Sequence, residues 1–233
     1  MKQVKLKAFI VACTIVTTLI TPLQAKEVDV DSSQLSTGMI DTTPVVETHN
    51  EKVRMYESMK SGARQTIPYN KIISVNFQTQ QNSYYCGPAS VRMVLGATGK
   101  IYEQDYIASQ IGTTTAGTGF GGTLLNAMNR LCGSGFSFNL VWGGSDLANK
   151  ARIAIYCGNP VLIDTCETDN FRIAGHGQWG IEYHYAVING YRNSGNTLVY
   201  TDPAYGMYKG TNLQCDYQAS LLAELCSNLG YIW

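Results

Sequence analysis

The sequence has few histidines, few prolines and no excess of charge of either sign. Its 233 residues include three histidines and six prolines, and 17 basic residues balance 17 acidic ones. No run or stripe of basic residues occurs, so nucleic acid and anionic membrane surfaces are poor candidates for partners. No CxxC pair and no Cys/His cluster has the spacing of a zinc site, and we therefore expect neither a metal nor another cofactor.

The chain also lacks an apolar run of the length that a membrane span needs. Three lysines in the first seven residues precede an apolar, threonine-containing stretch from Ala8 to Leu23, and the small residue Ala25 follows. This order is typical of a secretory signal, whereas a spanning helix needs about 20 apolar residues. We expect cleavage near Ala25 and a protein that is secreted or held at the cell surface, without stable insertion in the membrane. An uncleaved anchor is the alternative.

Behind the signal, the chain falls into two parts of different character. Without residues 1–25, 14 basic and 17 acidic residues remain, which gives a formal charge of −3. Residues 26–69 are polar, with a hint of a helix only at Val53–Met59, and we interpret them as a polar stalk or a pro-segment outside the core. Residues 70–233 are long enough for one domain with its own core.

The order of the predicted elements in residues 70–233 indicates an α+β fold. Helices come first and antiparallel strands come later, which argues against an alternating α/β sheet. No internal repeat is present. The helices are expected at Gly87–Leu95, Tyr102–Ser109, Thr123–Leu131 and Asp146–Tyr156, and the strands at Lys71–Phe77, Pro160–Thr165, Tyr183–Tyr191 and Thr197–Asp202.

Six cysteines remain after the signal, and Cys86 differs from the others in its surroundings. An even number in an exported chain predicts three disulfides. Yet Cys86 precedes Gly87 and Pro88 at the start of a predicted helix, where the helix dipole and unpaired N–H groups stabilise a thiolate. The dipole contributes only ~0.3–1 kcal/mol, so a nearby imidazole must supply most of the activation. We interpret the remaining cysteines as disulfide or core residues, with 157–166 and 215–226 as candidate local pairs; they are Cys132, Cys157, Cys166, Cys215 and Cys226.

The candidate base is His184. It lies on a predicted strand whose partner strand ends in Asp202. In contrast, His176 lies in a glycine-rich loop with no acid at an obvious spacing, and His49 lies in the polar stalk. A three-residue loop that ends at Gly195, in the left-handed conformation, places His184 and Asp202 on one face as diagonal neighbours within reach of each other. A four-residue loop would place them on opposite faces.

Acyl transfer also needs hydrogen-bond donors for the oxygen on which negative charge develops. Gln80 lies six residues before Cys86, on the loop that leads into the helix, so its amide can turn back beside the thiol. The backbone N–H of Cys86 is the second candidate donor. Gln81 competes with Gln80 for this role. Asn189 is an alternative to Asp202 as the orienting residue, although strand alternation points it to the other face.

These residues together resemble a known family. The segment Gln80-x5-Cys86-Gly87-Pro88-Ala89-Ser90, then a strand histidine, then Asp202-Pro203-Ala204-Tyr205-Gly206, is similar to the peptidases that cut double-glycine leaders in bacteriocin processing and to their secreted relatives. The similarity covers about Asn76–Gly206. It implies a papain-like cysteine proteinase fold, in which a helical first part carries the nucleophile at a helix N-terminus and packs on an antiparallel sheet that carries His and Asp.

The resemblance also implies roles for individual residues. Cys86 is the nucleophile, His184 the general base and acid, Asp202 the residue that orients the imidazole, and Gln80 the oxyanion donor. The leader-cutting members are parts of cytoplasmic ABC exporters, whereas this chain has an export signal and no transporter segment. Leader cleavage is therefore not implied.

The sequence thus predicts a secreted cysteine peptidase that hydrolyses peptide or protein substrates through a thioester. Tyr85, which adjoins Cys86, and Trp179 are candidate substrate-binding residues. The first alternative keeps the same chemistry on wall peptides or in a transpeptidation. The second is a non-catalytic peptide-binding domain, against which the presence of all four catalytic residue types argues.

Overall fold

The computed structural model describes the chain in several stretches. The predicted signal, His49 and Trp179 lie outside the described residues, as does most of the predicted stalk before Glu51. The described residues are 40–41, 51–63, 66–133, 135–140, 143–169, 171–177, 182–227 and 229–233.

Helices fill the first half of the described chain and the long strands lie in the second half, as predicted. The helices are α1 (Glu51–Lys60), α2 (Cys86–Ala97), α3 (Gln104–Ile111), α4 (Gly122–Cys132), α5 (Gly144–Tyr156) and α6 (Ala219–Leu225). The strands are β1 (Ile40–Asp41), β2 (Lys71–Ile72), β3 (Phe120–Gly121), β4 (Phe138–Asn139), β5 (Val161–Glu167), β6 (Glu182–Arg192), β7 (Thr197–Thr201), β8 (Gln214–Gln218) and β9 (Tyr231–Ile232).

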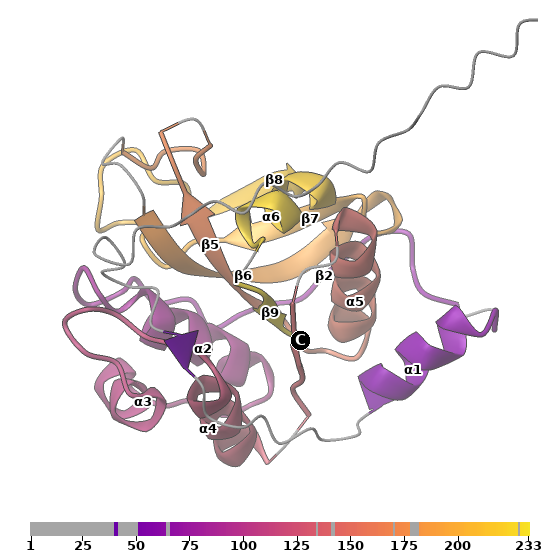
Figure 1. Ribbon diagram of the computed structural model, residues 1–233, viewed down its shortest axis with the longest axis horizontal. Coiled ribbons are helices and arrows are strands. Elements are labelled where there is room, and N and C mark those ends of the chain that lie inside the picture. The colour runs from indigo at the N-terminus through magenta and orange to yellow at the C-terminus, as the bar shows by residue number, and fades with distance from the viewer. Residues whose placement is uncertain are drawn as a thin grey trace, which may run out of the picture. The chain divides into compact units, whose positions relative to one another are not determined.

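A seven-stranded sheet forms the centre of the fold. Its strands lie in the order β4-β9-β5-β6-β7-β8, with β2 added to β6, and each described pair in it is antiparallel. The short strands β1 and β3 form a separate parallel pair. Helices α2, α3 and α4 cover one face of the sheet, while α5 and α6 cover the other (Figure 1).

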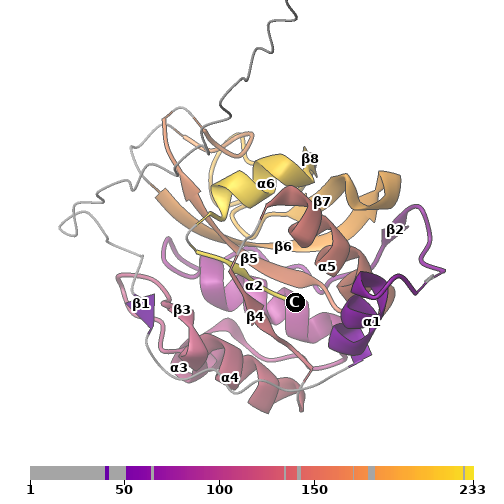
Figure 2. The same cartoon turned by 45° about the vertical axis from the view of Figure 1, so that its right-hand side comes forward.

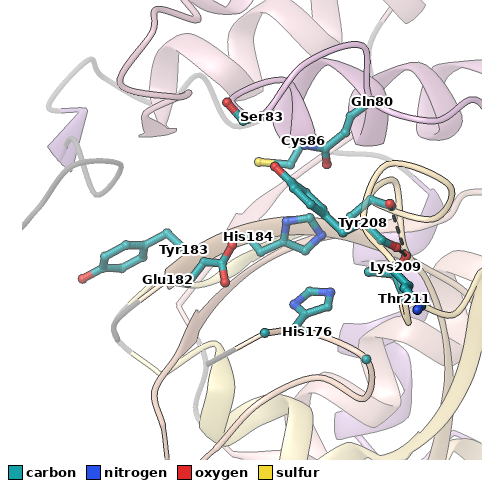
Figure 3. A pocket seen from close by; sticks show the side chains of 13 residues that line it. Gln80, Ser83, Cys86, His176, Glu182, Tyr183, His184, Tyr208, Lys209 and Thr211 are labelled. Carbon is teal, nitrogen blue, oxygen red and sulfur yellow. Dashed lines mark hydrogen bonds between the residues drawn. The ribbon is translucent and has the colours of Figure 1, made fainter. Parts of the chain in front are cut away.

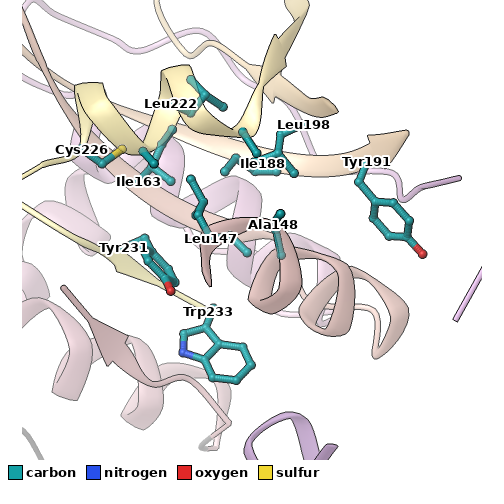
Figure 4. Packing of buried hydrophobic residues seen from close by; sticks show 14 of the residues in the cluster. Leu147, Ala148, Ile163, Ile188, Tyr191, Leu198, Leu222, Cys226, Tyr231 and Trp233 are labelled. Carbon is teal, nitrogen blue, oxygen red and sulfur yellow. The ribbon is translucent and has the colours of Figure 1, made fainter. Parts of the chain in front are cut away.

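Each face of the sheet has its own apolar core. Because successive side chains of a strand point to opposite faces, Ile163 of β5 packs in the cluster beneath α5 and α6, and its neighbour Leu162 packs in the cluster beneath α2 and α4. In the first cluster, Leu147 of α5 and Leu222 of α6 meet Ile188 of β6 (Figure 4). All these side chains are fully buried, and burial of each contributes about 1.5–3 kcal/mol.

Helix α1 belongs to the domain, which corrects the expectation that residues 26–69 lie outside the core. It packs against α5 (Figure 2), and its Met55 is part of the apolar cluster on that face. Lys52 is only 2% exposed, and its Nζ lies 4.6 Å from the centroid of the Phe136 ring. The packed domain therefore begins before Asn70. The division of the chain into a signal, a stalk and a peptidase domain stays a prediction.

The β6–β7 hairpin has the predicted alignment of its strands, but its loop is longer than predicted. Arg192 pairs with Thr197, so the loop has four residues rather than three. A register shift between Ile188 and Gly190 then leaves one extra residue in β6, and beyond it Val187 pairs with Thr201. This bulge restores the alignment that the longer loop would have lost. Gly195 has a φ of +94°, in the left-handed region as predicted.

No disulfide links the cysteines that the structure describes. All six cysteines after the predicted signal are free thiols. The candidate local pairs 157–166 and 215–226 are therefore not formed in this structure, which leaves the alternative that these cysteines are core residues. Cys226 is fully buried in the apolar cluster beside Ile163 (Figure 4), where it packs like a small apolar side chain.

Candidate active site

Cys86 is the first residue of α2, as predicted from the sequence around it. Its side chain is 9% exposed, and it borders a cavity. As the first helical residue, it has an N–H group without an acceptor inside the helix. Gly87 next to it is required by packing, because a Cβ at this position would lie 2.4 Å from Oγ1 of Thr118. The loop that ends at Thr118 therefore lies directly against the start of α2.

His184 of β6 connects Cys86 to Asp202. Its Nε2 lies 2.8 Å from Oδ1 of Asp202, and its side chain is also hydrogen-bonded to that of Cys86. Because Nε2 is engaged by Asp202, Nδ1 is the nitrogen left for the thiol. Burial lowers the pKa of His184, but the charge and hydrogen bond of Asp202 and the hydrogen bond to Cys86 outweigh burial and raise that pKa well above its usual value.

Asp202 lies one residue beyond β7 and is buried between two imidazoles. Its Oδ1 accepts hydrogen bonds from His184 and from the backbone N–H of Ala204, the latter at 2.8 Å. Its Oδ2 lies 2.7 Å from Nε2 of His176. Burial raises the pKa of Asp202, but the charge of His184 and the bonds to both histidines outweigh burial and hold that pKa well below its usual value. Asp202 is therefore an ionised acceptor for both rings.

His176 is a part of the site that the sequence argument passed over. Its Nδ1 lies 2.9 and 3.0 Å from the two carboxylate oxygens of Glu167, and its Nε2 is bonded to Asp202. Burial lowers the pKa of His176, but the hydrogen bonds to Asp202 and Glu167 raise it to about 9. His176 therefore has two acids as partners, although neither stands at an obvious spacing in the sequence. No sequence spacing could reveal these acids, because Glu167 lies nine positions before His176 and Asp202 lies 26 after it.

Gln80 lies beside Cys86, whereas Gln81 points elsewhere. The side chain of Gln80 is 3% exposed and lines the cavity, and its Nε2 donates to the carbonyl oxygen of Asn82 at 2.9 Å. Its backbone N–H donates to the carbonyl of Pro203 at 2.9 Å. Gln81 is exposed. The structure thus brings Gln80 into the group that contains the thiol, and leaves Gln81 outside it.

A cavity of about 480 Å³ lies over Cys86 and His184. Figure 3 shows Cys86 and Gln80 on one wall, the two imidazoles below them, and the Tyr208 ring between the walls. Tyr208 is a further cavity residue that no sequence motif marks. The predicted substrate-binding residue Tyr85 is not among the residues that line this cavity, because its hydroxyl points to Asp105 at 2.9 Å.

Two glycines bring the far walls of this cavity together. Gly175 precedes His176 and has a φ of +92°, in the left-handed region where glycine is favoured. A Cβ on Gly175 would lie 2.1 Å from the carbonyl oxygen of Gly210. The loop that carries His176 and the loop that carries Tyr208 therefore approach each other backbone to backbone.

The same residues form a group with the geometry of metal ligands. His176, His184 and Asp202 offer atoms that lie within 4.8 Å of one another. These residues are already bonded to one another, with Nε2 of His176 at 2.7 Å from Oδ2 of Asp202 and Nε2 of His184 at 2.8 Å from Oδ1. The group is therefore complete as a hydrogen-bonded network of acids and bases.

Comparison with known proteins gives a family and a fold. The sequence model of the Peptidase_C39 like family matches residues 72–221, which is more than half of the chain. Xylellain, a cysteine protease from Xylella fastidiosa, superposes with a TM-score of 0.53 at 8% identity, and the alignment covers 84% of this chain and 92% of xylellain. This confirms the expected α+β fold of papain-like cysteine proteases. Among the curated proteins, no relative of significant similarity was found.

Two peptidase domains of transporters are similar at lower TM-scores. A double glycine motif protease from an AMS/PCAT transporter, in complex with its leader peptide, has a TM-score of 0.47 at 17% identity, with 69% of this chain and 91% of that chain covered. The peptidase domain of Streptococcus ComA, a bifunctional ABC transporter, has a TM-score of 0.43 at 17% identity. The alignment covers 71% of this chain and 97% of that domain.

Proposed function

Because the chain belongs to the Peptidase_C39 like family and is a cysteine peptidase, we propose that it hydrolyses peptide bonds with Cys86 as nucleophile, His184 as base and acid, Asp202 as orienting residue and Gln80 as oxyanion donor. One observation carries this proposal. His184 is hydrogen-bonded to Cys86 on one side and to Asp202 on the other, at the floor of a cavity that Gln80 also lines. A thiol, a base and an orienter for that base are what nucleophilic catalysis by cysteine requires.

Before attack, the thiol proton of Cys86 resides on His184, because the pKa of that imidazole is raised well above its usual value. The thiolate sulfur attacks the carbonyl carbon of the peptide bond, a C–S bond forms, and the carbonyl electron pair moves to oxygen. Gln80 and the backbone N–H of Cys86 donate to that oxygen. The Nε2 of Gln80 carries two hydrogens and Asn82 accepts one of them, so the other is available for the substrate.

Collapse of this intermediate breaks the C–N bond. His184 gives its proton to the departing amine, and the acyl group stays on Cys86 as a thioester. Water then attacks the thioester carbon while His184 takes its proton, the C–S bond breaks, and the carboxylic acid product leaves. Throughout, Asp202 keeps Nε2 engaged, so that Nδ1 serves the sulfur and the substrate.

Matched cysteine variants test this assignment. We expect Cys86→Ala and His184→Ala to lose at least ~10³-fold in kcat/KM, as removal of members of such a catalytic group does. Cys132→Ala is the control, because that half-buried thiol lies at the end of α4, away from the cavity. Retention of hydrolysis by pure Cys86→Ala protein would refute the assignment.

We also propose that the protein is exported and acts on peptides outside the cytoplasm. The pattern of residues 1–25 supports export. In the described part of the chain, no helix combines the length and apolar character needed to cross a membrane. Unfolded protein and wall peptides are the substrates to compare. Release of new N-termini from unfolded protein supports the endopeptidase proposal, whereas turnover of wall peptides alone favours the wall-hydrolase alternative.

A further inference from the structure

His176 occupies a position that fixes its protonation by geometry. Its ring is 4% exposed and lies between two carboxylates, with Glu167 at Nδ1 and Asp202 at Nε2. Both carboxylates are buried too, since Glu167 is 0% and Asp202 is 1% exposed. Figure 3 shows this ring directly below that of His184. The two ring centroids are 4.9 Å apart, with an interplanar angle of 86°.

With both carboxylates ionised, the hydrogen-bond inventory allows one form of this imidazole. An ionised carboxylate only accepts, and a neutral imidazole has one N–H and one bare nitrogen. A neutral His176 would therefore direct the lone pair of its bare nitrogen at a carboxylate oxygen 2.7–3.0 Å away. Two buried carboxylates also need a cation between them. The doubly protonated ring satisfies both contacts and supplies that charge.

We propose that His176 is a positioning residue of the catalytic centre, a clamp that is cationic at neutral pH, that is held by Glu167 and that holds Asp202 against His184. The inference rests on the proposed function for its catalytic consequence, while its structural part stands without it. Each oxygen of Asp202 then has a fixed donor, with Oδ2 bonded to His176 and Oδ1 bonded to His184 and to the N–H of Ala204. The carboxylate cannot rotate away from His184 without breaking the bond to His176.

Glu167 is itself held in place, because it belongs to a strand of the sheet. It is the last residue of β5, and its Oε2 accepts the backbone N–H of Ile173 at 2.8 Å. The loop that carries His176 is tied at a second point, where the N–H of Ala174 donates to the hydroxyl of Tyr217 at 2.8 Å. The loop that carries His176 is therefore tied to both β5 and β8.

The charge on His176 should also influence the upper pH limit of activity, which is the pH at which His184 loses its proton. A cation beside Asp202 offsets part of the attraction between that carboxylate and the imidazolium of His184. Without this cation, His184 keeps its proton to higher pH. Asp164 is a neutral acid at pH 7, because burial raises its pKa to about 8 against the opposing charge of His184. Among the described residues, the titratable groups around the two rings are Cys86, Asp164, Glu167, Glu182, Tyr183, Tyr200, Asp202, Tyr208, Lys209 and Tyr217.

The structural part is tested by ¹⁵N NMR of the histidine rings in the Cys86→Ala variant, which needs no turnover. The chain has three histidines, so His49→Gln and His184→Gln assign the signals. We expect both ring nitrogens of His176 to be protonated at pH 7.5. We expect Glu167→Gln to lower its titration midpoint by at least one pH unit, since the side-chain amide keeps the shape but removes one charge. A neutral His176 at pH 7.5 would overturn the proposal.

The catalytic part is tested by the pH profile of kcat/KM. His176→Gln should lower the maximum by about tenfold and move the basic limb upward by about one pH unit, the scale of the interaction between two charges ~5 Å apart in a partly screened site. Tyr217→Phe is the matched control, because it loosens the same loop without removing a charge near neutral pH. Its basic limb should stay in place. An unshifted limb in His176→Gln, or an equal shift in Tyr217→Phe, would contradict the clamp.

The two tests separate this inference from the proposed function. If the protein hydrolyses no peptide but NMR finds a doubly protonated His176, the peptidase assignment of the site fails and the cationic clamp stands. If hydrolysis depends on Cys86 and His184 but His176 is neutral, the proposed function stands and the clamp fails.

Discussion

The backbone N–H of Gln80 donates to the carbonyl oxygen of Pro203 at 2.9 Å. This bond joins the loop before α2 to the loop after β7, so the proposed oxyanion donor is fixed to the residue next to Asp202. The hydroxyl of Thr79 reinforces it by donating to the carbonyl of Tyr205 at 2.8 Å. The two sequence motifs, which lie more than 120 residues apart, are thus one structural unit.

Removal of the Gln80 amide should affect the transition state more than substrate binding. We expect Gln80→Ala to lower kcat by about 10²–10³-fold with little change in KM, which is the usual cost of one oxyanion donor. Gln81→Ala is the control, because that side chain is exposed and the contribution of its backbone N–H to Gln104 survives the change. Equal losses in steady-state assays of both variants would show that Gln80 has no special role.

The close approach of Gly175 to Gly210 should make the cavity wall intolerant of a methyl group. Gly175→Ala adds a contact of 2.1 Å with a backbone oxygen, so we expect the two loops to separate and kcat/KM to fall at least tenfold. Gly158→Ala has a similar left-handed φ, of +88°, but open space around the new Cβ. It should cost only about 1–2 kcal/mol of stability and leave activity unchanged. Indistinguishable activity and melting temperatures of the two variants would contradict this account.

Two buried groups should drive stability in opposite directions between pH 7 and 9. Burial lowers the pKa of Lys52 to about 7, so in this range the unfolded state holds a proton that the folded state lacks, and stability rises with pH. The pKa of His176 is raised to about 9, so there the folded state holds the extra proton and stability falls with pH. Each slope is at most about 1.4 kcal/mol per pH unit.

Single variants should separate the two slopes. Asp164, whose folded pKa is about 8, also makes stability fall with pH in the lower half of this range, and it does so equally in all three proteins. Relative to the unmodified protein, the free energy of unfolding of Lys52→Met should therefore fall more steeply from pH 7 to 9. That of His176→Gln should fall less steeply or rise over the same range. Urea unfolding at several pH values measures these slopes. Parallel curves for all three proteins would rule out the assigned protonation states.

The core of the site was predictable from sequence because its residues lie in local motifs. Cys86 was placed by its glycine and proline neighbours at a helix start, and Asp202 by its place at the end of a strand. The predicted alignment of His184 with Asp202 is correct, but the predicted three-residue loop is not. The loop has four residues, and one extra residue in β6 compensates for the longer loop. That bulge involves Asn189, whose amide bonds to Ile73 and Thr201, and no local signal announces such distant partners.

The parts that the sequence did not reveal depend on long-range packing. His176 acquires its acids only when its loop folds back onto the end of β5, a strand that was expected to stop before Glu167. From its sequence, helix α1 is expected to be exposed, because Lys52 is charged. The burial of Lys52 depends on the rings of Phe136 and Trp233, which lie far along the chain. The final elements β8, α6 and β9 are short, and they complete the sheet and one of its cores.

The most direct test of the central claim is the rate at which iodoacetamide alkylates each cysteine at pH 5.5. The other thiols are internal controls, since burial raises the pKa of Cys157, Cys166 and Cys226. The account predicts that Cys86 is alkylated at least ~100-fold faster than these thiols and that His184→Ala abolishes the difference. Equal rates at Cys86 and the other cysteines, or a fast reaction at Cys86 that survives His184→Ala, would contradict it.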